Sequence, residues 1–219
     1  MSVEADSDLT SYYAARAQEY ESIYDKPERQ ADLATLRALV PDYFVGRDVL
    51  EVACGTGYWT QFIARRAASI AATDINAETL AIARTKPLPA GRVTFSKLDI
   101  HQLDAGERRY TGAFAGFWWS HLRTRERRGF IETLHRALNP GAVVVVLDNL
   151  YVAGSSTPIS HVDADGNSFQ ERRLRDGSKH TVLKNFPNED ALLADIRGFG
   201  VAPEYRTLDY YWVFKYEVA

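Results

Sequence analysis

Short apolar runs alternate with segments of helical periodicity along most of this chain. The runs of strand length are Asp48–Ala53, Ser69–Asp74, Val93–Lys97, Gly112–Trp118 and Ala142–Leu147. Apolar positions recur at helical spacing in Ser11–Tyr20, Leu33–Val40, Trp59–Ala67, Ala77–Thr85 and Glu126–Leu138. Regular alternation of strand and helix predicts an α/β fold, with a doubly wound and mostly parallel sheet.

The last third of the chain breaks this alternation. A helix over Glu189–Phe199 and strands over Glu204–Leu208 and Tyr210–Glu217 are predicted at the end. Before them, Ser168–Leu174 and Ser178–Lys184 flank Asp176-Gly177, a hairpin signal. A two-residue turn would place Arg173 opposite His180, whereas a slip of one residue would bring Arg172 to that face. Either register predicts a basic hairpin above the carboxyl edge of the sheet.

Composition limits the class of protein. A chain of 219 residues with 46% hydrophobic residues is long enough for one globular domain, residues 1–219. No apolar run approaches the length that crosses a bilayer, and the acidic N-terminus lacks the apolar core of a signal peptide. The single cysteine, Cys54, excludes an internal disulfide. These features predict a cytoplasmic protein without a membrane partner.

Charge and histidine content narrow the partners. The net charge of −3 does not indicate a general nucleic-acid surface. Five histidines and one cysteine show no zinc-type spacing, so no metal is predicted. The remaining expectation is a small-molecule ligand, bound by a monomer or a homodimer.

The segment from Val49 to Thr60 carries the clearest motif. An apolar strand ends near Glu51 and is followed by Gly55 and Gly57, whose freedom lets bare backbone approach a ligand. A dinucleotide fingerprint would have a third glycine where this chain has Thr60. The motif resembles that of the class I S-adenosylmethionine-dependent methyltransferases, which implies a seven-stranded sheet and S-adenosylmethionine as the cofactor.

The ends of the next two strands extend this resemblance. Asp74 can accept both ribose hydroxyl hydrogens, although it could instead cap the following helix. Asp99 with Ile100 matches the adenine site of the family, and an ordinary strand-end turn is the alternative. Glu51 is expected to organise the glycine loop near the cofactor amine. The resemblance also assigns to the cofactor site Tyr13, Arg16, Trp59, Ile75 and Phe117.

The methyl acceptor decides which further residues matter. The exit of the fourth strand, with Trp118 and His121, lies where the family places its reactive centre. A base is needed only if the acceptor arrives protonated. His121 would therefore deprotonate a hydroxyl acceptor, or orient an acceptor that is already ionised.

A second resemblance concerns the acceptor. The segments Tyr12–Tyr20, Tyr58–Thr60 and Leu174–Phe186 look like those of phosphonate O-methyltransferases of the dehydrophos type. That resemblance implies anion recognition by Arg172, Lys184 and a tyrosine, here Tyr24. We also expect an N-terminal helical lid, residues 1–46, and a hairpin insertion, residues 151–186, that forms part of the acceptor site.

Other functions fit the same motifs. An N- or C-methyltransferase would share the cofactor site without the anion-binding residues. A non-catalytic module could bind S-adenosylmethionine as a sensor or scaffold. A nicotinamide oxidoreductase is disfavoured by Thr60. The expected activity is transfer of a methyl group to an oxygen of a small anionic metabolite.

Overall fold

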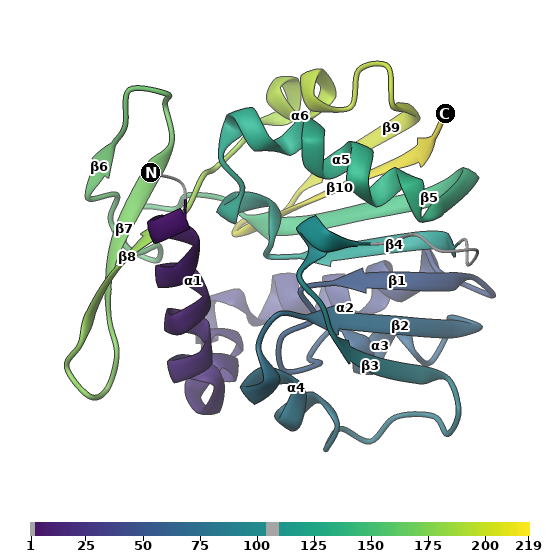
Figure 1. The fold of residues 1–219 in the computed structure, drawn as a ribbon, viewed down its shortest axis with the longest axis horizontal. Coiled ribbons are helices and arrows are strands. Elements are labelled where there is room, and N and C mark those ends of the chain that lie inside the picture. The colour runs from purple at the N-terminus through teal and green to yellow at the C-terminus, as the bar shows by residue number, and fades with distance from the viewer. Residues whose placement is uncertain (1–2, 104–109) are drawn as a thin grey trace.

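The main sheet has seven strands in the order β3-β2-β1-β4-β5-β10-β9 (Figure 1). The computed structural model describes residues 3–103 and 110–219, with side chains from residue 9 onward. Strands β1 to β5 run parallel, whereas β10 pairs antiparallel with both β5 and β9. This is the predicted mostly parallel α/β sheet.

The strands and helices have the following bounds. The main sheet contains β1 (Asp48–Val52), β2 (Ser69–Asp74), β3 (Val93–Lys97), β4 (Tyr110–Gly116), β5 (Leu138–Asn149), β9 (Gly200–Thr207) and β10 (Tyr211–Val218). The helices are α1 (Val3–Arg16), α2 (Gln30–Asp42), α3 (Thr60–Ile63), α4 (Ala77–Ala83), α5 (Arg127–Arg136) and α6 (Glu189–Asp195). The 3₁₀ helices Ala17–Tyr24 and Pro27–Arg29 connect α1 to α2.

Alternation along the central strands creates two cores. Val49 packs with residues of α2, α3 and α4, whereas Leu50 and Val52 pack with residues of α5 and α6. Both sets are buried, which explains why these strands read as continuous apolar runs rather than as alternating ones. The sheet is therefore covered on both faces, and its strand ends are left for a ligand.

An insertion after β5 forms a separate three-stranded sheet, β6 (His161–Val162), β7 (Ser168–Arg173) and β8 (Lys179–Leu183). Helix α1 stands between this small sheet and the carboxyl ends of the parallel strands (Figure 1). Tyr12 of α1 packs on Leu174 and Val182 of the insertion. The N-terminal segment and the insertion thus meet above the sheet edge.

Several predicted boundaries are wrong. Asn139, Pro140 and Gly141 do not form a separate turn but lie within β5, where Gly141 has a φ of 74° and the pairing with β4 shifts register. A bulge absorbs the turn-forming residues without ending the strand. The helix expected over Ser11–Tyr20 begins earlier as α1 and becomes a 3₁₀ helix at Ala17. Among the described residues, no helix is both long and apolar enough to span a bilayer.

Candidate active site

A cavity of about 140 Å³ opens at the carboxyl ends of β1, β2, β3 and β4. The residues that line it include Ala53, Gly55, Asp74, Ile75, Asn76, Thr79, Leu98, Asp99, Ile100, Gly116, Phe117 and Trp118. Most of them follow strand ends, as expected for a ligand site in an open α/β sheet. We call this the cofactor cavity.

The two glycines of the loop have different surroundings. Gly55, at a φ of 56°, donates its N–H to Oδ2 of Asp74 over 2.8 Å. Gly57, at a φ of 75°, lies against α4, where a Cβ would come within 3.1 Å of the Cβ of Ala83. Gly55 lines the cofactor cavity and Gly57 does not. Gly57 therefore allows close packing behind the loop rather than contact with the ligand.

Asp74 holds the start of α4 and also lines the cofactor cavity. Its Oδ1 accepts from the backbone N–H of Asn76 at 2.8 Å and from Oγ1 of Thr79 at 3.1 Å, which fixes the start of α4. Burial raises the pKa of Asp74 above its ordinary value. The carboxylate nevertheless lines the cofactor cavity, as does Ile75, an apolar residue that is 38% exposed there. An exposed apolar side chain beside a polar group suits an adenosine-like ligand.

Glu51 lies behind the glycine loop in a small hollow shared with Gly55 and Trp59. Its side chain is 1% exposed, its Oε2 has no hydrogen-bond partner, and burial raises its pKa to about 8. A buried carboxyl group without a partner is costly. Ala53, Gly55 and Gly116 line both this hollow and the cofactor cavity, so the ammonium group of S-adenosylmethionine would have Glu51 within reach as its acidic partner.

A second and larger cavity, of about 530 Å³, adjoins the first. It is formed by α1, the two 3₁₀ helices, the segment after β5 and the β7–β8 hairpin. Its basic lining residues are Arg16, Lys26, Arg29, Arg172, Arg173, Arg175 and Lys184, against the acidic Glu19 and Glu171. We call this the acceptor cavity, and its lining favours an anion.

The two predicted anion-binding residues differ in their surroundings. Lys184 is buried and donates to Oδ1 of Asp148 at 2.8 Å and to Oγ of Ser120 at 2.6 Å. Although burial disfavours the charge of Asp148, the neighbouring Lys184 ammonium holds the pKa of that carboxyl below its usual value. Arg172 has no carboxylate within ion-pair distance among the described residues, and its buried Nε has no hydrogen-bond partner. Arg172 is thus the uncompensated cation of the two.

The register of the hairpin explains why Arg172 faces the cavity. Arg172 lies opposite His180, and Arg173 lies opposite Lys179, so the two-residue turn is wrong and the slipped register is the one observed. The N–H of Leu174 donates to the carbonyl of Ser178, and Gly177 has a φ of 89°. A three-residue loop with glycine in the left-handed position closes the hairpin and moves the pairing by one residue.

Four residues line both cavities, namely Tyr13, Tyr20, Phe117 and His121. The Tyr13 hydroxyl is 2.8 Å from Nε2 of His121, and Nδ1 of His121 is 2.6 Å from the carbonyl oxygen of Leu183. Because a carbonyl only accepts, Nδ1 carries the proton and Nε2 accepts from Tyr13. Burial, with the charges of Lys184 and Arg172, lowers the pKa of His121 to about 3. His121 is therefore neutral and already hydrogen-bonded.

Other predicted site residues lie elsewhere. Arg16 lines the acceptor cavity rather than the cofactor cavity, and donates to the Tyr12 hydroxyl at 2.8 Å. Trp118, expected at the acceptor, lines the cofactor cavity. Tyr24 lines neither, because its ring stacks on Tyr58 at 3.6 Å between centroids. Trp59 packs in the core beneath Phe117.

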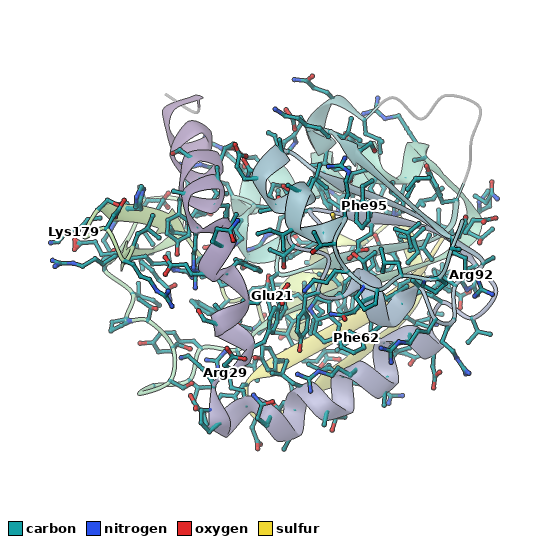
Figure 2. The ribbon with its side chains drawn as sticks, turned by 90° about the horizontal axis from the view of Figure 1, so that it is seen from below. Glu21, Arg29, Phe62, Arg92, Phe95 and Lys179 are labelled. Atoms are coloured by element: carbon teal, nitrogen blue, oxygen red, sulfur yellow. The ribbon has the colours of Figure 1, made fainter. Side chains whose placement is uncertain are left out.

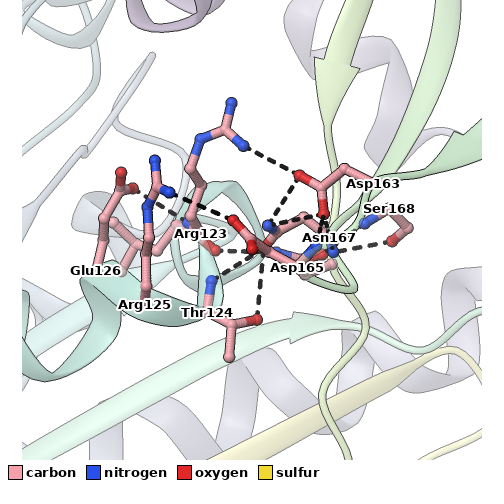
Figure 3. A network of polar contacts seen from close by, with 10 residues as sticks. Arg123, Thr124, Arg125, Glu126, Asp163, Asp165, Asn167 and Ser168 are labelled. Carbon is pink, nitrogen blue, oxygen red and sulfur yellow. Dashed lines mark hydrogen bonds and ion pairs between the residues drawn. The ribbon is translucent and has the colours of Figure 1, made fainter. Parts of the chain in front are cut away.

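Ion pairs and hydrogen bonds join the insertion to the segment that precedes α5 (Figure 3). Arg123 pairs with Asp163 at 3.2 Å, and Arg125 pairs with Asp165 at 3.3 Å. Oδ1 of Asn167 accepts from the backbone N–H of Thr124 at 3.0 Å. These contacts hold the insertion beside the segment that carries His121. Within residues 3–103 and 110–219, no group of acidic, histidine or cysteine side chains is arranged to hold a metal.

Comparisons with known proteins agree with this geometry. Residues 49–141 match a sequence model described as a methyltransferase domain. A structure of DhpI with SAH covers 98% of this chain and 97% of its own, at 26% identity and a TM-score of 0.76. The DhpI–SAM–HEP complex covers 96% and 97%, at 26% identity and a TM-score of 0.78.

A more distant likeness adds only the fold. Magnesium protoporphyrin IX methyltransferase from Synechocystis PCC 6803, with bound SAM, is 15% identical, with a TM-score of 0.66 over 96% of this chain and 95% of its own. No curated protein matches the chain by sequence. The methyltransferase-domain match and the structures of DhpI with SAH and SAM indicate S-adenosylmethionine as the cofactor.

Proposed function

Because the chain is a class I S-adenosylmethionine-dependent methyltransferase, we propose that it methylates an oxygen of a small anionic acceptor, a phosphonate or a carboxylate. The observation that carries this proposal is the meeting of the two cavities at Tyr13 and His121, with Arg172 lining the acceptor side. A donor in one cavity and an acceptor in the other would face each other at these residues.

The charge of the acceptor cavity supports an anion. Arg175 pairs with Glu19 at 2.6 Å, and Lys184 pairs with Asp148. Within the described residues, no carboxylate lies within ion-pair distance of the other basic lining residues, Arg16, Lys26, Arg29, Arg172 and Arg173. Cations gathered in a sheltered cavity without acidic partners favour binding of an acidic ligand.

The state of His121 favours an acceptor that is already ionised. The sulfonium of S-adenosylmethionine supplies an electrophilic methyl group, whose transfer breaks a carbon–sulfur bond and forms a carbon–oxygen bond. An ionised oxygen has no proton to lose, so no base is needed. A neutral histidine with a pKa of about 3, bonded to Tyr13, is a poor base. Its hydrogen bond with Tyr13 holds that hydroxyl at the junction of the two cavities, and burial raises the pKa of Tyr13, so the hydroxyl stays protonated.

The likeness to DhpI points the same way. The DhpI complex holds SAM together with HEP, and its fold covers nearly the whole of this chain. The hairpin that carries Arg172 and Lys184 therefore lies within the region of similarity. We also propose that α1 with the 3₁₀ helices acts as a lid and that residues 151–186 complete the acceptor site, since both line the acceptor cavity.

Kinetics with an Arg172 variant test the proposal. Small phosphonates and carboxylates are screened with S-adenosylmethionine, and the best acceptor is taken to Arg172→Gln. Loss of a charge-assisted hydrogen bond should raise the acceptor KM about tenfold or more, without changing the Kd of S-adenosylhomocysteine.

Lys179→Gln is the matched control. Lys179 is exposed on the same hairpin, lies at its outer side away from the sheet (Figure 2) and does not line the cavity. Its KM should stay at the wild-type value. An unchanged KM in Arg172→Gln, or transfer only to uncharged amines or carbon acids, would contradict the proposal and favour an N- or C-methyltransferase.

A further inference from the structure

A second cationic centre lies in the acceptor cavity, where the N-terminal segment turns into α2 (Figure 2). Arg29 is 6% exposed, and its Nη1 donates to Oδ1 of Asn149 at 3.0 Å. Its Nε and Nη2 reach Oγ of Ser155 at 3.2 and 3.0 Å. Lys26, also in the lining, donates to the carbonyl of Ser155 at 2.6 Å. Two cations thus converge on the loop after β5.

Neither cation has a carboxylate partner within ion-pair distance in the part of the chain that the structure describes. The carboxylate that reaches this loop is the exposed Glu28, whose Oε1 accepts from Oγ of Ser155 at 2.9 Å and which does not line the cavity. Burial and the nearby charge of Arg29 lower the pKa of Lys26, against the influence of Glu28. The Arg29 guanidinium is buried without an acidic partner, and the partly buried Lys26 beside it adds a second positive charge, so an anionic ligand would be favoured here.

A row of hydrogen bonds connects Arg29 to Lys184, the buried lysine on the other side of the acceptor cavity. Oδ1 of Asn149 accepts from Arg29, and Nδ2 of Asn149 donates to Oδ1 of Asp148 at 3.1 Å. The same carboxylate oxygen accepts from Lys184. Arg29 and Lys184 are therefore the two ends of one hydrogen-bonded row, and both line the acceptor cavity. These hydrogen bonds fix the separation between the Arg29 guanidinium and the Lys184 ammonium.

The size of the cavity leaves room for a ligand that reaches both centres. Its volume of about 530 Å³ is in the range that holds drug-sized molecules, well beyond a single phosphonate or carboxylate group. Arg29 also rests on the rings of Tyr210 and Tyr211, at 5.2 and 5.5 Å, which holds its guanidinium in place. A positioned guanidinium is well suited to a planar carboxylate or a phosphate.

We infer that Lys26 and Arg29 form a second anion-binding subsite, so that the acceptor carries an acidic group at each of its two ends. One group is methylated beside Tyr13 and His121, and the other is held by Lys26 and Arg29. This inference rests on the proposed function, since it describes the acceptor of the same reaction.

Matched acceptors test the subsite. A series of phosphonates with a terminal carboxylate, of increasing chain length, is compared with alkylphosphonates of the same lengths. In the wild type, the best two-anion acceptor should have a KM at least about tenfold below that of its alkyl counterpart. Lys26→Gln and Arg29→Lys should each remove most of that advantage, by raising the KM of the two-anion acceptor by a clearly larger factor than the KM of the alkylphosphonate. Arg172→Gln should weaken both acceptors.

The controls distinguish failure of the second subsite from failure of the proposed function. Lys179→Gln should retain the preference, and the Kd of S-adenosylhomocysteine reports whether each variant keeps its cofactor site. If Arg29→Lys does not fold, Lys26→Gln decides. Equal KM values for the two kinds of acceptor, or equal losses for both in Lys26→Gln, would overturn the second subsite. Transfer to no phosphonate or carboxylate at all would overturn the proposed function instead.

Discussion

The cofactor cavity and the acceptor cavity are adjacent but are built in different ways. The cofactor cavity is formed mainly by short loops at the ends of neighbouring strands, and its charged groups include Asp74 and Asp99. The acceptor cavity is almost four times as large, about 530 Å³ against about 140 Å³, and its lining is mostly basic. Its walls come from the N-terminal segment and the insertion, which are far apart in the sequence.

This difference separates what the fold supplies from what is added to it. Any chain with this strand order brings the ends of β1, β2 and β4 to one edge, where a nucleotide-like ligand binds. The acceptor cavity exists only because α1 and the β7–β8 hairpin meet above that edge. The sheet edge therefore forms the cofactor cavity, and the added segments form most of the acceptor cavity.

The largest expected effect is a loss of cofactor binding that leaves the acceptor cavity unchanged. Asp74→Ala should weaken S-adenosylmethionine binding at least about a hundredfold, because it removes a carboxylate that can accept two hydroxyl hydrogens. Calorimetric titration measures the Kd, and the exposed Asp42→Ala serves as the control. The acceptor KM at saturating cofactor should change little. Asp74→Asn, which retains an acceptor for the N–H of Asn76, should show a smaller loss.

The second effect concerns stability. Glu51 has a folded pKa of about 8 against an ordinary value of 4.5, so folding favours its neutral form. That contribution is present in full below about pH 4.5 and is lost as the pH rises through 8. Glu51→Gln cannot ionise. Without cofactor, it should exceed the wild type in free energy of unfolding by a margin that grows with pH over this window, by up to about 1.4 kcal/mol per pH unit.

Denaturant titrations at several pH values measure this margin. Glu132→Gln, an exposed substitution on α5, should show no such growth. Added S-adenosylmethionine should reduce the margin, since its ammonium would pair with the ionised carboxyl. A margin independent of pH would show that Glu51 is not the buried acid described here.

The smallest expected effect is on kcat, and it tests whether His121, where the two cavities meet, orients the acceptor or acts as a base. If His121 only orients the acceptor, His121→Asn should lower kcat less than about tenfold, whereas loss of a general base costs about a hundredfold or more. Because its pKa is about 3, the ratio of wild-type to variant rates should stay constant between about pH 5 and about pH 8. A ratio that falls toward acid pH would assign the proton transfer to His121. The exposed His161→Asn is the control.

Most of the sheet could be predicted from the sequence. The bounds of β2 and β3 agree with the predicted strands Ser69–Asp74 and Val93–Lys97. Strand β2 is buried and therefore a continuous apolar segment, whereas β3 is an edge strand in which Val93 and Phe95 alternate with polar residues. The strand-end positions of Asp74 and Asp99 follow from the same pattern. The Asn-Pro-Gly segment misled the prediction, because a bulge within β5 accommodates residues that usually end a strand.

The acceptor cavity was harder to predict, because its geometry depends on distant contacts. A shift of one residue in the hairpin decides whether Arg172 or Arg173 faces His180, and the dipeptide Asp176-Gly177 suits either loop length. Tyr24 packs on Tyr58, and no local pattern shows that contact. Arg29 precedes the first residue of α2 and would ordinarily be exposed, so its burial beside Asn149 and Ser155 left no signal in the sequence.

The nature of the methylated atom tests the central claim most directly. The protein is incubated with S-adenosylmethionine carrying a ¹³C-labelled methyl group and with the best phosphonate acceptor, and the product is examined by NMR. The account predicts a labelled methyl on a phosphonate oxygen, with its protons coupled to phosphorus, and a signal several-fold weaker in Arg172→Gln at an acceptor concentration below the wild-type KM. A labelled methyl on nitrogen or carbon, or a signal that Arg172→Gln leaves unchanged, would contradict it.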